Sequence, residues 1–116
     1  RPFLTRIPDQ AIVAAAPAAA ADRVQATRDG RSGLRDATYL MAYFPGPVSA
    51  TIDTTVIASP RLRAWWFDPR SGEARPIGDL ENTGPKEFTP PAGDDGGDWV
   101  LVIDDAAAAR RPPGGP

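Results

Sequence analysis

Residues 62–72 read Leu-Arg-Ala-Trp-Trp-Phe-Asp-Pro-Arg-Ser-Gly and contain two of the three tryptophans of the chain side by side. The last five of these residues form a turn sequence, because proline fixes φ, aspartate caps the turn and glycine accepts a positive φ. The stretch therefore predicts a strand over residues 62–67 that leads into a hairpin.

Side chains of a strand alternate between its two faces. Here they divide into two sets, Leu62, Ala64 and Trp66 on one face and Arg63, Trp65 and Phe67 on the other. Both faces carry aromatic bulk, which is typical of a strand inside a sheet with its second face partly covered. We expect Trp66 to be buried.

Composition narrows the class of protein. The 116 residues include 14 prolines and 11 glycines, as in a single domain of short elements and frequent turns. No apolar run approaches the roughly 20 residues of a membrane span, and a net charge of −2 argues against binding to nucleic acid. The chain has no cysteine and no histidine, so disulfides, zinc fingers and histidine-based catalytic triads are excluded.

Further runs have strand character. Residues 24–28 alternate, with Val24, Ala26 and Arg28 on one face. The aromatic run 38–44 is expected to be the sheet neighbour of the tryptophan strand, and residues 73–77 to return from the hairpin, with Pro76 at an edge or bulge. Other expected strands are 10–15, 48–53 and the buried run 99–103, with a loop at 78–86. The fold class is all-β, an antiparallel β-sandwich of about seven or eight short strands.

The domain organisation follows from the ends of the chain. Residues 1–9 are interpreted as a lead-in segment from a preceding domain, since the chain starts at Arg1 and its prolines forbid a helix. Residues 10–105 form the sandwich. Residues 106–116, rich in alanine, proline and glycine, predict a disordered tail.

Carboxylates are the remaining candidates for catalysis. Glycoside hydrolysis requires two of them about 5–10 Å apart across a cleft. Glu73, Glu81 and Glu87 fall in turns or on edge strands, where charged residues are normally solvated. We expect no catalytic residues in this chain.

A binding site is a second hypothesis. Tyr43, Trp65 and Phe67 could form an exposed aromatic platform on which sugar rings stack, with Arg70 beside it. The alternative, which we favour, is that these aromatics serve packing, in the core or against a neighbouring domain. Asp94, Asp95 and Asp98 around Gly96 and Gly97 offer oxygen ligands for calcium, but an acidic glycine turn is ordinarily solvated. We therefore expect no cofactor, with calcium as the alternative.

Five segments together resemble a known domain: Arg-Ile-Pro-Asp-Gln (6–10), Ala-Thr-Arg-Asp-Gly (26–30), Trp-Trp-Phe-Asp-Pro-Arg-Ser-Gly (65–72), Phe-Thr-Pro-Pro (88–91) and Asp-Trp-Val-Leu-Val (98–102). The domain is the C-terminal β-sandwich called the putative collagen-binding domain of a collagenase, which follows the (β/α)8 barrel of apiosidase-like glycoside hydrolases.

This resemblance implies a non-catalytic accessory domain of a secreted or periplasmic bacterial enzyme. Its implied partner is the (β/α)8 glycosidase domain of the same polypeptide, on which it packs; nucleic acid and membranes are not expected. The face with Phe3, Ile7 and one aromatic side of the sheet is then expected to contact the barrel. The alternative function is a module that binds polysaccharide or collagen through the aromatic platform.

Overall fold

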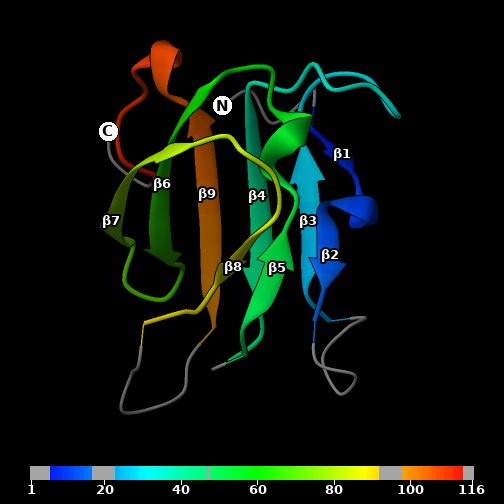
Figure 1. Ribbon diagram of the computed structural model, residues 1–116. Coiled ribbons are helices and arrows are strands. Elements are labelled where there is room, and N and C mark those ends of the chain that lie inside the picture. Colours follow the sequence, from blue (N-terminus) through cyan, green and yellow to red (C-terminus); the bar gives the residue numbers. More distant parts are fainter. Residues whose placement is uncertain (1–5, 17–22, 47, 92–97, 114–116) are drawn as a thin grey trace.

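The computed structural model describes residues 6–16, 23–46, 48–91 and 98–113, which form a sandwich of two sheets (Figure 1). The larger sheet has the strand order β1-β3-β4-β9-β6-β7 and the smaller one β2-β5-β8. The six strands of the larger sheet are β1 (Ile7–Pro8), β3 (Gln25–Arg28), β4 (Tyr39–Phe44), β9 (Trp99–Asp105), β6 (Arg61–Asp68) and β7 (Glu73–Glu81). The smaller sheet contains β2 (Val13–Ala15), β5 (Ala50–Ile52) and β8 (Lys86–Phe88).

Every strand pair in these two sheets is antiparallel, so the predicted fold class is confirmed, with nine strands in the described residues. The described residues also form three short 3-10 helices, η2 (Gln10–Ile12), η3 (Thr54–Val56) and, after the last strand, η4 (Ala106–Ala108). None of the helices in the described ranges has the length and apolar character needed to cross a membrane.

The predicted tryptophan strand and its hairpin are confirmed. Strand β6 ends at Asp68, whose side chain accepts a hydrogen bond from the Arg70 amide at 2.9 Å, and Gly72 takes the expected positive φ of 75°. Strand β7 is an edge strand, and the β6–β7 register shifts between Ala64 and Trp65, opposite Pro76. However, β7 continues to Glu81, so the loop predicted over residues 78–86 is wrong for its first four residues.

The prediction that the aromatic run 38–44 is the sheet neighbour of the tryptophan strand is wrong. Strands β4 and β6 are both internal, but β9 lies between them and pairs with each (Figure 1). The last strand of the sheet in sequence therefore occupies a central place. Its apolar character on both faces, read from residues 99–103, fits this position.

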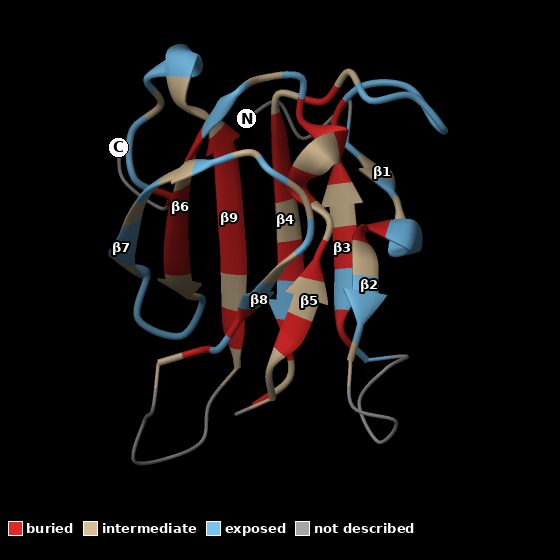
Figure 2. Ribbon diagram, viewed as in Figure 1, coloured by how far each residue is buried: buried red, intermediate tan, exposed pale blue. Residues whose placement is uncertain are grey.

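The core cluster is formed by buried residues of both sheets, and Figure 2 shows buried positions on β4, β6 and β9 of the large sheet and on β5 of the small one. Trp66 is 6% exposed and its ring meets that of Phe44 edge-on, with centroids 5.0 Å apart and planes at 87°. The same face of the large sheet contributes alternate residues from β4, β6 and β9: Leu40, Ala42, Leu62, Ala64, Trp99, Leu101 and Ile103. We call this the inner face, and the opposite face of the large sheet the outer face.

The N-terminal segment joins the large sheet at its edge. Ile7 and Pro8 pair with Arg28 and Thr27, and the Asp9 amide donates to the Ala26 carbonyl at 3.0 Å. The strand predicted over residues 10–15 is correct only for β2, because residues 10–12 form η2. Phe3 lies outside the described residues, and the boundary between a lead-in segment and the domain stays a prediction.

The structure describes the C-terminal segment as far as residue 113, which includes part of the stretch 106–116 for which composition predicts a disordered tail. Arg110 donates to the Thr38 carbonyl at 3.3 Å and to Asp104 Oδ1 at 3.4 Å, and its guanidinium lies 5.2 Å from the centroid of the Tyr39 ring. Composition alone did not reveal that one arginine would find a buried carboxylate and an aromatic ring. Residues 114–116 lie outside the described residues.

Candidate functional site

The aromatic residues proposed as a platform share the outer face of the large sheet. Tyr43 of β4 is paired with Val100 of β9, which in turn is paired with Phe67 of β6. Trp65 occupies the next row, where it is paired with Val102 of β9. The structure thus brings Tyr43 and Phe67 into one row, with β9 between them, and places Trp65 nearby.

These side chains differ in accessibility. Tyr43 is 40% exposed, Phe67 is half-buried and Trp65 is only 9% exposed. The indole Nε1 of Trp65 donates to Asp104 Oδ2 at 3.3 Å, and Asp104 is itself 1% exposed. Trp65 is therefore a packing residue that satisfies a buried carboxylate, and of the three only Tyr43 presents an open ring.

Arg70 stands in the β6–β7 turn. Its Nε donates to Asp68 Oδ1 at 3.3 Å, the same atom that accepts from the Arg70 amide. The hydrogen bond from the Arg70 amide is the largest cause of a pKa of Asp68 below 3.8; the Arg70 side chain lowers the pKa further, and burial opposes this shift. These contacts give Arg70 a role in closing the hairpin.

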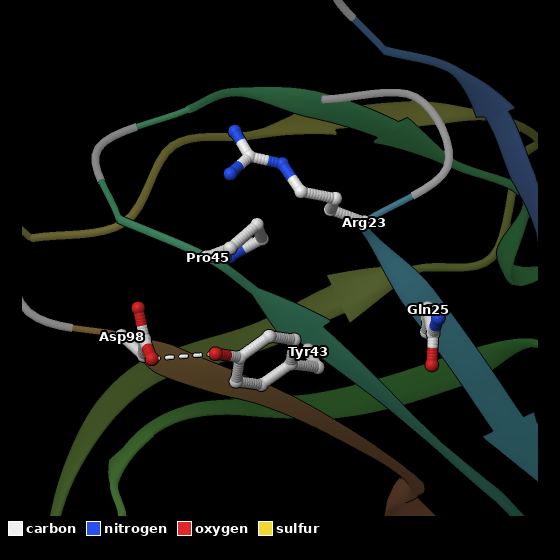
Figure 3. A pocket seen from close by; sticks show the side chains of 5 residues that line it. All are labelled: Arg23, Gln25, Tyr43, Pro45 and Asp98. Atoms are coloured by element: carbon white, nitrogen blue, oxygen red, sulfur yellow. Dashed lines mark hydrogen bonds between the residues drawn. The ribbon is translucent and has the colours of Figure 1, made fainter. Parts of the chain in front are cut away.

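The exposed ring of Tyr43 lines a hollow of about 480 Å³ (Figure 3). Its other lining residues are Arg23, Gln25, Pro45 and Asp98. Gln25 is the β3 partner of Tyr43, while Pro45 directly follows β4 and Asp98 directly precedes β9. The hollow is therefore built at one end of three adjacent strands, which hold its walls in register.

The Tyr43 hydroxyl donates to Asp98 Oδ2 at 2.5 Å, and Figure 3 shows the two side chains directed at each other. This hydrogen bond is the largest cause of a pKa of Tyr43 above 10.0; burial and the negative charge of Asp98 add to it. The hydroxyl accordingly stays protonated at neutral pH, and the ring is held in one orientation.

A second hollow, of about 190 Å³, lies near Arg28 and is lined in part by Asp9, Arg35 and Asp53. Arg28 is 1% exposed and each of its three guanidinium nitrogens donates a hydrogen bond: Nε to the Asp29 carbonyl at 2.8 Å, Nη1 to Asp9 at 3.2 Å and Nη2 to Asp36 at 2.8 Å. These bonds tie the N-terminal segment to the sheet. We assign this cluster a structural role.

Two of the glutamates weighed as catalytic candidates, Glu73 and Glu81, do not form a pair. Glu73 and Glu81 are the first and last residues of β7, roughly 27 Å apart for an extended strand of this length. Glu87 lies in β8 of the other sheet, and all three are exposed. Such a separation is far beyond the 5–10 Å that glycoside hydrolysis requires.

The calcium candidates fall largely outside the described residues, which do not include Asp94 and Asp95. Asp98 is described, and one of its carboxylate oxygens is engaged by Tyr43. Within the part of the chain that the structure describes, no group of three acidic, histidine or cysteine side chains is arranged to hold a metal ion.

One known protein family matches most of the chain. Residues 7–104 match the family described as "Putative collagen-binding domain of a collagenase". The chain belongs to this family. No curated protein matches the chain.

Two solved structures resemble this family member, one described as a glycoside hydrolase and the other as a glycoside hydrolase family 5 from Bacteroides vulgatus ATCC 8482. Each shows 30% sequence identity and a TM-score of 0.77 over 92% of this chain. The chain spans only 22% of the length of each of them. It corresponds to one domain-sized part of a glycoside hydrolase.

Sequence reasoning identified Tyr43 and Asp98 separately, as a stacking residue and as a metal ligand, and missed their bond to each other. It also missed Arg23, Gln25 and Pro45. A signal for Gln25 was present, since both runs 24–28 and 38–44 were predicted as strands. Their register, which places Gln25 opposite Tyr43, could not be read from either run alone.

Proposed function

We propose that this chain is a non-catalytic accessory domain of a bacterial glycoside hydrolase, in which it packs on the catalytic (β/α)8 barrel and supports it. The observation that carries the proposal is the match of 92% of the chain to 22% of two glycoside hydrolases at 30% identity. The rest of such an enzyme is long enough to hold the barrel, which needs about 250 residues. The proposal includes a secreted or periplasmic location, where such an enzyme would meet polysaccharide.

The separation of the glutamates supports a non-catalytic role. Exposed carboxylates at opposite ends of β7 cannot act together on one glycosidic bond. Hydrolysis is therefore assigned to the partner barrel, and this domain contributes stability to it.

The outer face offers a surface for this contact. Val100, Phe67 and Ala74 form one row across β9, β6 and β7, and Pro76 lies opposite Trp65 in the next row. Val100, Phe67 and Ala74 are half-buried and Pro76 is exposed. We name these four residues the Phe67 patch. Contacts between domains of one chain typically bury about 600–1,500 Å², and an apolar patch that extends over β9, β6 and the edge strand β7 is suited to that purpose.

The test uses the polypeptide in which the barrel and this domain are joined. Phe67→Asp should lower its thermal unfolding temperature and its hydrolase activity, because a charge would be buried at the interface. The same substitution in the isolated 116-residue chain should change stability much less. The matched control is Leu34→Asp, since Leu34 is an accessible apolar residue (44% exposed) that lies outside the patch, in a loop before β4.

Two results would contradict the proposal. One is an equal loss of stability from Phe67→Asp in the joined and isolated forms, since the patch would then have no partner. The other is hydrolysis of aryl glycosides or glycans by the purified isolated chain that disappears on substitution of Glu73, Glu81 or Glu87.

A further inference from the structure

The hollow beside Tyr43 has the features of a ligand-binding site. A domain that only supports a barrel would not require such a site. Its volume of about 480 Å³ lies within the range of ligand sites, roughly 300–1,000 Å³. It is built from the ends of β3, β4 and β9, which are rigidly paired, so its shape exists before any ligand arrives.

An oriented aromatic ring forms one wall. Tyr43 is 40% exposed although its hydroxyl is fixed by Asp98, so its ring keeps one position without being covered. Pro45 adds a second apolar surface (Figure 3). A ring of this kind offers a large contact area and loses little side-chain entropy on binding.

Polar groups with spare hydrogen-bonding capacity surround the ring. Arg23 and Gln25 are exposed, and neither side chain has a hydrogen-bond partner among the described residues. Asp98 uses Oδ2 for Tyr43, and its Oδ1 has no partner within the same described ranges. Together these residues offer guanidinium and amide donors beside amide and carboxylate acceptors.

This mixture favours a neutral polyhydroxy ligand. One cation and one anion face the hollow. A phosphate or another strongly negative group would be attracted by Arg23 and repelled by Asp98. Hydroxyl groups donate and accept, and can therefore satisfy both kinds of partner. The C–H face of a sugar ring supplies the apolar surface that Tyr43 and Pro45 require.

We propose that this hollow is a carbohydrate subsite, in which one sugar ring of a neutral oligosaccharide stacks on Tyr43 and its hydroxyl groups bond Arg23, Gln25 and Asp98. The choice of ligand class rests in part on the proposed role beside a glycoside hydrolase. The site would hold polysaccharide near the enzyme without cleaving it.

The test titrates the 116-residue chain with hexasaccharides of β-1,4-linked glucose, xylose and mannose, followed by amide chemical shifts in NMR spectra. At least one sugar should shift the amide resonances of residues 23–25, 43, 44 and 98. Tyr43→Ala should weaken that affinity about tenfold or more. Tyr43→Phe, which keeps the ring, should retain most of it. Phe67→Ala is the matched control, because Phe67 lies on the same face but outside the hollow.

Gln25→Ala and Arg23→Ala provide a second measurement if Tyr43→Ala impairs folding, since both residues are exposed and each should weaken binding severalfold. Absence of shifts with every sugar at millimolar concentration would overturn the proposal. So would an affinity that Tyr43→Ala and Gln25→Ala leave unchanged, or binding at this hollow of a triple-helical Gly-Pro-Pro peptide in place of the sugars. None of these results would alter the outcome of the Phe67 experiment, which measures stability of the joined polypeptide, so the two proposals fail separately.

Discussion

A single buried cation connects three segments of the chain. Arg28 lies on the face of β3 that also carries Val24 and Ala26, as the alternation of residues 24–28 predicted. Its bonds reach Asp9 before η2 and Asp36 before β4. A buried charge is tolerated only when it is paired and fully hydrogen-bonded, so Arg28 fixes the relative positions of these segments.

The neighbouring glycine is fitted to the same arrangement. Gly30 has φ of 85°, and a Cβ atom on it would lie 2.4 Å from Asp36 Oδ1 and 2.9 Å from Arg28 Nη2. No other residue type could occupy this position without displacing the ion pair. The dipeptide Asp29-Gly30, read from sequence as a turn, thus also preserves space for Asp36.

Asp36 should make stability depend on pH. Hydrogen bonds from the Arg31 backbone and side chain hold the pKa of Asp36 below 3.8, and the charges of Arg31 and Arg28 add to this. A folded-state pKa below the unfolded value gives stability that is present above the unfolded pKa and is lost as pH falls through the folded one.

The advantage of the wild-type chain over Asp36→Asn in thermal unfolding should therefore be constant above about pH 5 and shrink below about pH 4. Glu87→Gln, an exposed change in β8, is the control. A difference that is independent of pH from neutral to acid would show that the charge of Asp36 is not involved.

Trp66 is one of two tryptophans in the core cluster, and its removal tests the packing between the sheets. Trp66→Ala should lower the free energy of unfolding by about 3–5 kcal/mol, because a cavity would open beside Phe44. Urea denaturation followed by circular dichroism measures this. Tyr43→Ala, at an exposed position of β4, should cost far less; comparable losses for both variants would contradict the assignment of the inner face.

Elements whose partners are close in sequence were predicted well. The β6–β7 hairpin was fixed by the turn at Asp68 to Gly72, and the edge position of β7 by Pro76. Elements whose partners are distant were not. Two aromatic runs, β4 and β6, look like neighbours by composition, yet nothing in either run encodes that β9 separates them.

The same reason limited the prediction of the site. Its five residues come from three strand ends that only the assembled sheet brings together. Tyr43 could be selected from sequence because large aromatics are few. Arg23 and Gln25 could not, because exposed polar residues of this kind occur throughout the chain and only the register distinguishes these two.

The segment after β9 should contribute to stability through Arg110. This side chain is 21% exposed and bonds Asp104, which is almost fully buried. Arg110→Ala should cost about 1–3 kcal/mol, since a buried carboxylate would lose a charged partner. Arg110→Lys keeps the charge but loses the planar contact with Tyr39. Its free energy of unfolding should fall between that of the wild-type chain and that of Arg110→Ala.

Limited proteolysis followed by mass spectrometry would locate this effect. Cleavage within residues 106–113 should become faster in Arg110→Ala while the rest of the domain stays protected. If the cleavage rate and the free energy of unfolding are both unchanged, the segment is ordered by contacts other than those of Arg110.

At the scale of the whole molecule, the two sheets depend on β9. This strand pairs with β4 on one side and β6 on the other, and contributes Trp99, Leu101 and Ile103 to the core. A chain shortened to residues 1–97 would divide the large sheet into separate parts with open edges. Its circular dichroism spectrum should lack the strand signal of the full chain, and a native-like spectrum would contradict this account.

The central place of β9 also has a consequence for biosynthesis. A ribosome makes β4 and β6 long before the strand that joins them, so both wait with their inner faces exposed while the intervening residues are added. The pairing that joins β4 to β6 becomes available only once Asp105, the last residue of β9, has left the exit tunnel. Stalled nascent chains should accordingly change from protease-sensitive to protease-resistant in one late step, and until that step they are the form of this protein that most needs a chaperone.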